Sequence, residues 1–87
     1  MTNVNVTAVE MLPLGGATNA GLKLGWIDSA AKAAQDDTWT VTNATEVLVC
    51  IAIDDSAGTL DENTISTNVI TLANASTGAT SALIVYK

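Results

Sequence analysis

Apolar and polar residues alternate with a period of two in several short segments of this chain. In residues 3–7, Val4 and Val6 fall on one side and polar groups fall on the other. A β-strand that is buried on one face produces this alternation. The same criterion, together with flanking turn residues, predicts further strands over residues 22–26, 38–42, 65–73 and 79–86.

The alternation in the first segment changes phase after residue 8. The apolar positions move to Val9 and Met11, and this shift requires either a β-bulge or a switch of the chain from one sheet to another. Pro13 lacks a backbone donor and the pair Gly15-Gly16 favours a turn. The first strand region is therefore expected to end near residue 12.

Residues 46–53 contain the longest apolar run of the sequence, which extends from Val47 to Ile53. A run of this length, rich in β-branched residues and bounded by polar clusters, is typical of a strand that is covered on both faces. The segment is predicted to be the central strand. In an oligomer, a neighbouring subunit would cover one of its two faces.

Residues 28–37 leave two alternatives open. Asp28 or Ser29 is a suitable cap for a short helix near residues 29–35, where several alanines have a high helix propensity. Such a short helix is marginal by itself, and this one has almost no large side chain to bury. An irregular loop is the competing interpretation.

These segments together predict an all-β fold: a small antiparallel β-sandwich or partly open barrel of about six short strands, with residues 1–87 as a single domain. Trp26 and Trp39 lie on the apolar faces of predicted strands, so both are expected in the core. Cys50 is the single cysteine of the chain and cannot form an internal disulfide. It is expected to be a buried thiol.

Acidic residues outnumber basic ones by nine to three, which gives a formal net charge of -6. This balance argues against nucleic acid as a partner, because affinity for phosphates comes largely from Lys and Arg. It argues against an anionic membrane surface for the same reason. The sequence shows no secretory signal and no apolar run near the roughly 20 residues that a membrane helix needs. We therefore expect synthesis and retention in a cytosol.

Groups that could carry catalysis are sparse. The chain has no histidine, so the usual general base is missing, and it has no phosphate-binding loop or nucleophile elbow. The best metal candidate is an irregular calcium site on the acidic stretch Asp54, Asp55, Asp61 and Glu62. These residues lack the EF-hand spacing, so a solvated acidic turn is the favoured interpretation. We expect no cofactor and no enzymatic activity.

Residues 3–9 and 39–49, together with loops rich in Ala, Thr and Gly, resemble the small head-decoration, or cement, proteins of tailed bacteriophages. The resemblance implies a β-rich virion protein, made in the host cytoplasm, that binds the outside of the capsid and stabilises it by protein contacts. Its implied partner is the lattice of the major capsid protein. Its implied state is a symmetric homo-oligomer, with a trimer favoured. The alternative is a self-assembling structural subunit of a filament, tail or tube.

The N-terminal segment is the predicted attachment element of such a protein. Residues 1–9 alternate and lie at a chain end, so they are able to extend and pair with the exposed edge of a neighbouring sheet. Val4, Val6 and Val9 are the predicted interface residues. The alternative is that this segment is simply the first strand of its own domain.

Overall fold

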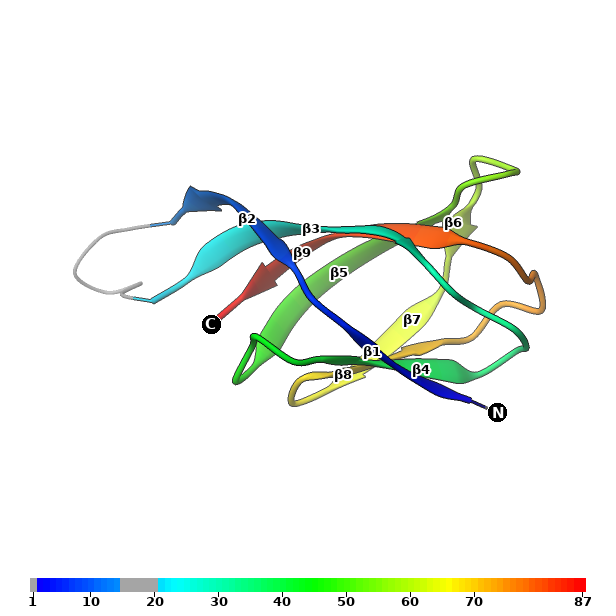
Figure 1. The fold of residues 1–87 in the computed structure, drawn as a ribbon, viewed down its shortest axis with the longest axis horizontal. Helices are drawn as coiled ribbons and strands as arrows, with labels where there is room; N and C mark the ends of the chain where they lie inside the picture. The colour runs from blue at the N-terminus through cyan, green and yellow to red at the C-terminus, as the bar shows by residue number, and fades with distance from the viewer. Residues whose placement is uncertain (1, 15–20) are drawn as a thin grey trace.

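The computed structural model describes residues 2–14 and 21–87, which form two β-sheets packed face to face (Figure 1). This arrangement confirms the predicted all-β fold of the sandwich type. The predicted turn at Gly15-Gly16 lies outside the described residues. The strands are β1 (Asn3–Val6), β2 (Val9–Pro13), β3 (Lys23–Ala30), β4 (Asp37–Val41), β5 (Val47–Asp54), β6 (Leu60–Asp61), β7 (Asn63–Ser66), β8 (Val69–Leu72) and β9 (Thr80–Tyr86).

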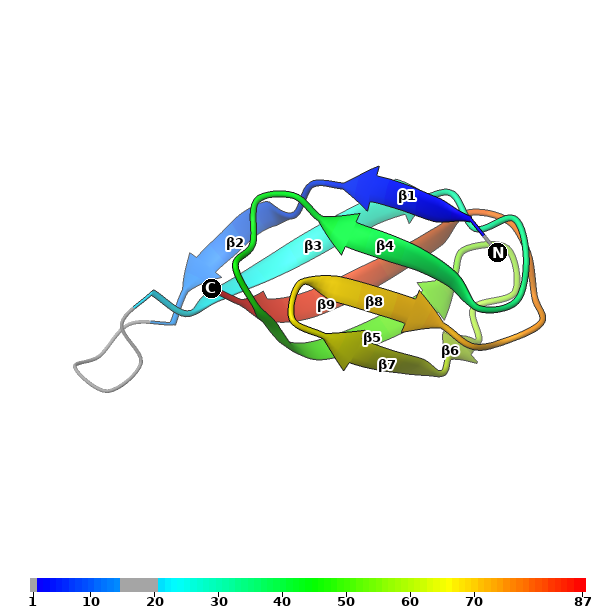
Figure 2. The same ribbon diagram turned by 90° about the horizontal axis from the view of Figure 1, so that it is seen from below.

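The four-stranded sheet has the order β1-β4-β8-β7, and the five-stranded sheet has the order β2-β3-β9-β5-β6. The four-stranded sheet lies in front in Figure 2, with the five-stranded sheet behind it. Only the β1–β4 pair is parallel among the pairings described. The central strand of the five-stranded sheet is β9. The prediction that residues 46–53 form the central strand is therefore wrong, because β5 lies one position further out.

The phase change after residue 8 corresponds to a switch between sheets. The chain leaves the four-stranded sheet at Val6 and enters the five-stranded sheet at Val9, as Figure 1 shows. Asn43 fixes the crossing point, because its side chain accepts from Ala8 N at 3.0 Å and donates to Ala8 O at 2.8 Å. A β-bulge follows at residue 11, so both devices that the sequence allowed occur in succession.

Residues 65–73 form the end of one strand and the whole of another, contrary to the single strand predicted there. The chain reverses between β7 and β8 at Thr67, whose φ of 56° is left-handed. A non-glycine residue accepts this conformation when a tight turn requires it. The segment between Asp54 and residue 65, where no strand is predicted, contains the short strand β6. The described residues therefore form nine strands, more than the about six predicted.

Residues 29–35 contain no helix, so the irregular loop is the alternative that the chain adopts. β3 extends to Ala30, and the loop that follows is held by contacts to other segments. The carboxylate of Asp37 accepts from Ala33 N at 2.7 Å and from Ala34 N at 3.0 Å. Lys32 and Gly78 exchange two backbone hydrogen bonds of 3.2 and 2.8 Å. These bonds occupy the donors that a helix would use internally.

The core lies between the sheets and includes only one of the two predicted tryptophans. Trp39 is fully buried and its ring nitrogen donates to Ala31 O at 3.0 Å, whereas Trp26 is half-buried on the outer side of β3. The inward positions of β3 are Gly25 and Ile27. The buried apolar residues are Val6, Ala8, Ile27, Trp39, Val41, Ala44, Val47, Ala52, Ile70, Leu72, Ala82, Ile84 and Tyr86.

Candidate functional site: an apolar sheet face

The outer side of the five-stranded sheet carries rows of apolar side chains. Residues paired across neighbouring strands share a face of the sheet, so the pairing register places these side chains side by side. One row contains Leu12, Leu24, Val85 and Val49, the next contains Val9, Trp26, Leu83 and Ile51, and the third contains Ile53 and Leu60 beside Ser81. We call the apolar residues of these rows the apolar face. No position in the rows carries a charge.

Much of the apolar face is open to solvent. Val9 is 62% exposed, Ile51 is 46% exposed and Leu60 is 65% exposed. The tryptophan of the face, Trp26, is half-buried among its neighbours. Monomeric soluble proteins rarely expose connected apolar patches larger than a few hundred Å². This side of the sheet therefore has the character of a contact surface.

The outer side of the four-stranded sheet has the opposite chemistry. Its rows are polar apart from one valine, and Asn3 accepts from the hydroxyls of Thr38 and Thr40 at 2.8 and 3.0 Å. Side chains of this kind remain hydrated at little cost. We call this surface the hydroxyl face. Its residues are Asn3, Asn5, Thr38, Thr40, Thr64, Ser66, Val69 and Thr71.

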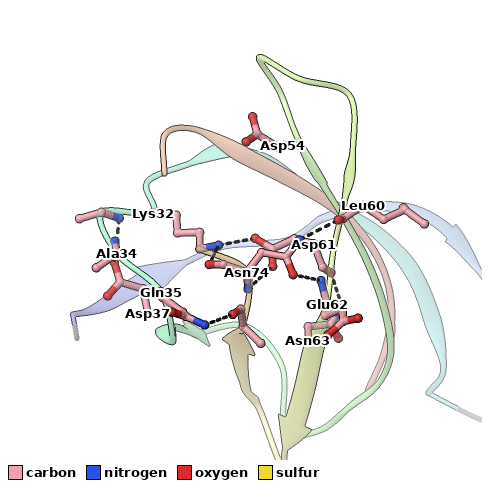
Figure 3. A network of polar contacts seen from close by, with 12 residues as sticks. Lys32, Ala34, Gln35, Asp37, Asp54, Leu60, Asp61, Glu62, Asn63 and Asn74 are labelled. Atoms are coloured by element: carbon pink, nitrogen blue, oxygen red, sulfur yellow. Dashed lines mark hydrogen bonds and ion pairs between the residues drawn. The ribbon is translucent and has the colours of Figure 1, made fainter. Parts of the chain in front are cut away.

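A buried ion pair closes one end of the sandwich. Lys32 Nζ lies 2.6 Å from Asp61 Oδ2 and also donates to Asn74 O at 2.6 Å, as Figure 3 shows. The side chains of Lys32 and Asp61 are at most 1% exposed. The second oxygen of Asp61 accepts from Asn74 N at 3.0 Å. The network joins β6 of one sheet to the segment that follows β8 of the other, so its role is structural.

The four residues of the calcium candidate do not converge. Asp61 is paired with Lys32, and Asp54 accepts from the Ser56 hydroxyl and from the backbone N–H groups at residues 56 and 57. Asp55 accepts from the hydroxyls at positions 29 and 81. Within residues 2–14 and 21–87, no group of three or more potential metal ligands occurs. The carboxylates of Asp54, Asp55 and Asp61 are therefore separate, each with its own hydrogen-bond partners.

The surroundings of Asp37, Asp54 and Cys50 shift the pKa values of these side chains. The N–H of Thr2, followed by those of Ala33 and Ala34, lowers the pKa of the buried Asp37 carboxyl. Hydrogen bonds from Ser56 lower the pKa of Asp54. Burial, and secondarily the charge of Asp61, raises the pKa of the Cys50 thiol to about 12.

Cys50 is packed against the core but is only partly buried. The prediction of a buried thiol is therefore correct only in part. A thiol with so high a pKa has almost no thiolate at neutral pH, and the thiolate is the nucleophilic form. The side chain is thus better suited to packing than to covalent chemistry.

The predicted interface residues do not share a surface. Val6 is 6% exposed and belongs to the core, Val4 packs against that core, and Val9 lies on the apolar face. In the described residues, β1 pairs with β4 of its own domain and Thr2 N donates to Asp37 at 2.6 Å. Of the three valines, Val9 is the one whose side chain is available for contact with a partner.

A depression of about 330 Å³ lies beside the loop after β3, but its polar groups are already engaged. The amine of Lys32 points to Asp61, and the hydroxyl of Ser29 donates to Asp55 at 2.7 Å. A second depression, of about 230 Å³, lies between β5 and β6 at the border of the apolar face. It includes Ile51 and Leu60 from that face. The second depression is therefore continuous with the candidate contact surface.

No protein-family model, curated protein or solved structure matches this chain. No helix in the described part of the chain is long and apolar enough to cross a membrane. Sequence reasoning did not identify the apolar face as a unit. Two patterns in the sequence point to this face. Residues 47–53 are apolar on both sides of the strand, and Leu24 and Trp26 place large apolar side chains on one side of the neighbouring segment.

Proposed function

We propose that this protein is a non-catalytic structural subunit of a multi-copy assembly, and that the apolar face is its contact surface. The observation that carries the proposal is the uncharged apolar face on a sheet that already buries its other side in the core. Folding of a two-layer sandwich requires one apolar side per sheet. A second apolar side is accounted for by contact with another protein.

The specific assembly that we propose is the decorated head of a tailed bacteriophage, as the sequence resemblance implies. Each copy contributes a modest apolar contact, and many copies on one lattice make the total attachment strong. A virion location and the capsid lattice as partner are parts of this proposal. Support comes from the small size of the subunit and from the separation of an apolar face from a hydroxyl face that is suited to solvent.

Purified chain incubated with undecorated phage heads and imaged by electron microscopy tests the proposal. The wild-type chain is expected to add a regular outer layer. Ile51→Lys, which places a charge in the apolar face, is expected to abolish the layer. Thr64→Lys places the same charge at an exposed position of the hydroxyl face and is expected to leave it intact.

The opposite pattern, with loss of decoration in Thr64→Lys and retention in Ile51→Lys, would contradict the assignment of the contact surface. Bare heads with wild-type chain would contradict capsid decoration. Filaments or tubes formed by the chain alone would favour the alternative structural role, in which the subunit contacts only its own copies.

A further inference from the structure

The depression of about 330 Å³ lies between the loop after β3 and the segment that leads into β9. Its lining consists of small side chains and main chain, together with Lys32, whose amine points away to Asp61. The lining residues are Ser29, Ala31, Lys32, Ala33, Gly78 and Ala79. A space of this size is able to accommodate a long side chain of another protein.

Both side-chain donors of this lining are engaged within the protein. Ser29 Oγ donates to Asp55 at 2.7 Å, and Lys32 Nζ belongs to the buried ion pair. Main-chain donors are engaged as well, because Ser29 N donates to Ser81 Oγ at 2.9 Å and Lys32 exchanges two backbone hydrogen bonds with Gly78. The depression therefore favours an occupant that donates hydrogen bonds over one that accepts them.

Two exposed carboxylates lie at the rim of the depression, both within reach of the Ser29 hydroxyl. Ser29 Oγ is 2.7 Å from Asp55 Oδ2 and 3.4 Å from Asp28 Oδ1. Ser81 Oγ donates to the other oxygen of Asp55 at 2.7 Å, and this second bond fixes the orientation of the carboxylate. Neither carboxylate takes part in an ion pair within the described residues. This corner therefore presents two negative charges to a partner.

The two carboxylates border the apolar face. Asp28 follows Trp26 by two residues on β3, so both side chains lie on the outer side of the sheet. Asp55 is bonded to Ser81, which its pairing with Ile53 places in the third row of that side. A partner that covers the apolar face therefore meets the two carboxylates at the border of the contact, beside the depression.

We infer that the capsid partner presents an arginine side chain to this corner. The inference rests on the proposed use of the apolar face as the capsid contact surface. The methylene groups of the arginine lie along the depression, and its guanidinium donates to Asp55 and Asp28. A guanidinium carries five N–H donors in one plane and is able to bridge two carboxylates, whereas an ammonium is a compact point charge.

The two carboxylates also argue against an uncharged occupant. An aromatic or aliphatic side chain would fit the depression, but the partner surface around it would remove water from Asp28 and Asp55 without replacing its hydrogen bonds. Such desolvation of unpaired charge is unfavourable. Opposite charge at the border of an interface instead favours one orientation of the partner.

Titration of the full chain with n-propylguanidinium, which is the arginine side chain as a free molecule, tests the corner without phage heads. The amide chemical shifts of Ser29, Asp55 and Gly78 are expected to change in NMR spectra at millimolar probe concentrations. 1-Butanol has a similar apolar stem without a charge and is expected to leave these shifts unchanged. Equal changes with both probes, no change with n-propylguanidinium, or an unaltered response of the double variant Asp28→Asn, Asp55→Asn would each overturn the inference.

Decoration of phage heads provides the second test. Asp28→Asn and Asp55→Asn are each expected to raise the concentration of chain that half-covers the heads by roughly twofold to tenfold at low ionic strength, with a smaller difference at high salt. Asp36→Asn makes the same change in net charge at an exposed position outside the lining of the depression, and it is expected to decorate like the wild type. Thermal melting confirms that the variants are folded.

The apolar part of the site has its own pair of variants. Ala31→Leu places a larger side chain in the depression and is expected to weaken decoration. Ala75→Leu adds the same atoms at an exposed position outside the lining and is expected to have no effect. Equal decoration by these two variants would overturn the placement of the arginine stem in the depression.

The outcomes separate this inference from the proposed function. Heads that the wild type, Asp28→Asn and Asp55→Asn cover equally well would overturn the arginine contact and leave decoration standing. Heads that the wild-type chain leaves bare would contradict capsid decoration, and the n-propylguanidinium titration would then decide whether the corner binds a guanidinium at all.

Discussion

The two outer faces of this sandwich come from the same two-residue alternation and have opposite chemistry. On β4, the buried Trp39 and Val41 alternate with threonines, whereas on β5 the inward Ala52 alternates with Ile51 and Ile53. The four-stranded sheet thus has an apolar inner side and a polar, hydrated outer side, whereas the five-stranded sheet has two apolar sides. The difference shows that the apolar content of this chain exceeds what its fold buries, and that the excess is concentrated on one surface.

The two tryptophans give the sharpest test of this comparison. Trp39→Ala removes a fully buried ring between the sheets and is expected to lower the free energy of unfolding by about 3–5 kcal/mol. Trp26→Ala removes a half-buried ring from the apolar face and is expected to cost roughly 1 kcal/mol in the monomer. Urea unfolding at low protein concentration measures both. Equal losses would mean that the apolar face belongs to the folding core.

The tryptophans also show which features of the fold the sequence predicts and which it leaves undecided. The two-residue period is local, so it predicts the strands and the two-layer fold. It does not decide which side faces inward when both sides are apolar, as in β3. There Trp26 is the larger residue, yet Gly25 faces the core because the ring of Tyr86 fills the space beside it. That contact joins strands about sixty residues apart along the chain, and the sequence pattern carries no signal for it.

The candidate site was predictable to a similar extent. The apolar character of both sides of residues 47–53 predicted a strand with a second covered side, and the rest of the apolar face follows from pairing. The pairing of β5 with β9, and of β9 with β3, aligns Ile51, Leu83 and Trp26 in one row. This register depends on contacts between segments that are distant in the sequence. The sequence pattern therefore predicts the individual strands but not how their apolar residues align across the sheet.

Removing one charge of the buried ion pair should lower the free energy of unfolding more than removing one charge of the exposed pair. Lys32→Met leaves the carboxylate of Asp61 buried without its cation and is expected to cost about 3–5 kcal/mol of unfolding free energy. The double variant Lys32→Met, Asp61→Leu removes both charges and is expected to recover most of that loss. Lys87→Met removes one partner of the exposed pair with Glu46 and should cost less than about 1 kcal/mol. Urea unfolding of the three variants ranks their losses of unfolding free energy. A Lys32→Met variant as stable as the wild type would show that the ion pair is dispensable.

Adjacent positions on β3 provide a smaller contrast between inside and outside. A Cβ at residue 25 would lie 2.5 Å from a ring carbon of Tyr86, so Gly25→Ala is expected to cost about 1–3 kcal/mol through overpacking. Leu24→Ala truncates a neighbouring side chain on the apolar face and should cost less in the monomer. It should weaken attachment to phage heads instead. Thermal melting and electron microscopy of incubated heads separate these two effects, and a Gly25→Ala variant as stable as the wild type would refute the close approach.

The smallest expected effect is the pH dependence that Asp37 contributes at the inner side of the four-stranded sheet. Hydrogen bonds from Thr2, Ala33 and Ala34 hold its pKa in the folded protein below the ordinary value of 3.8. The folded state therefore binds this proton less readily than the unfolded state does. The resulting stabilisation is complete well above pH 3.8 and is lost as the pH falls through the lower pKa of the folded protein.

Asp37→Asn tests this contribution, because an amide cannot titrate and offers one acceptor oxygen where the carboxylate offers two. The variant is expected to be less stable than the wild type at neutral pH, and the difference should narrow as the solution is acidified below pH 4, an approximate limit set by the reference value of Asp. Urea unfolding across this range measures the narrowing. A difference that stays constant down to the most acidic condition would show that Asp37 acts through its shape alone, and the acid sensitivity of the protein would then have to come from other carboxylates such as Asp54, whose pKa is also lowered.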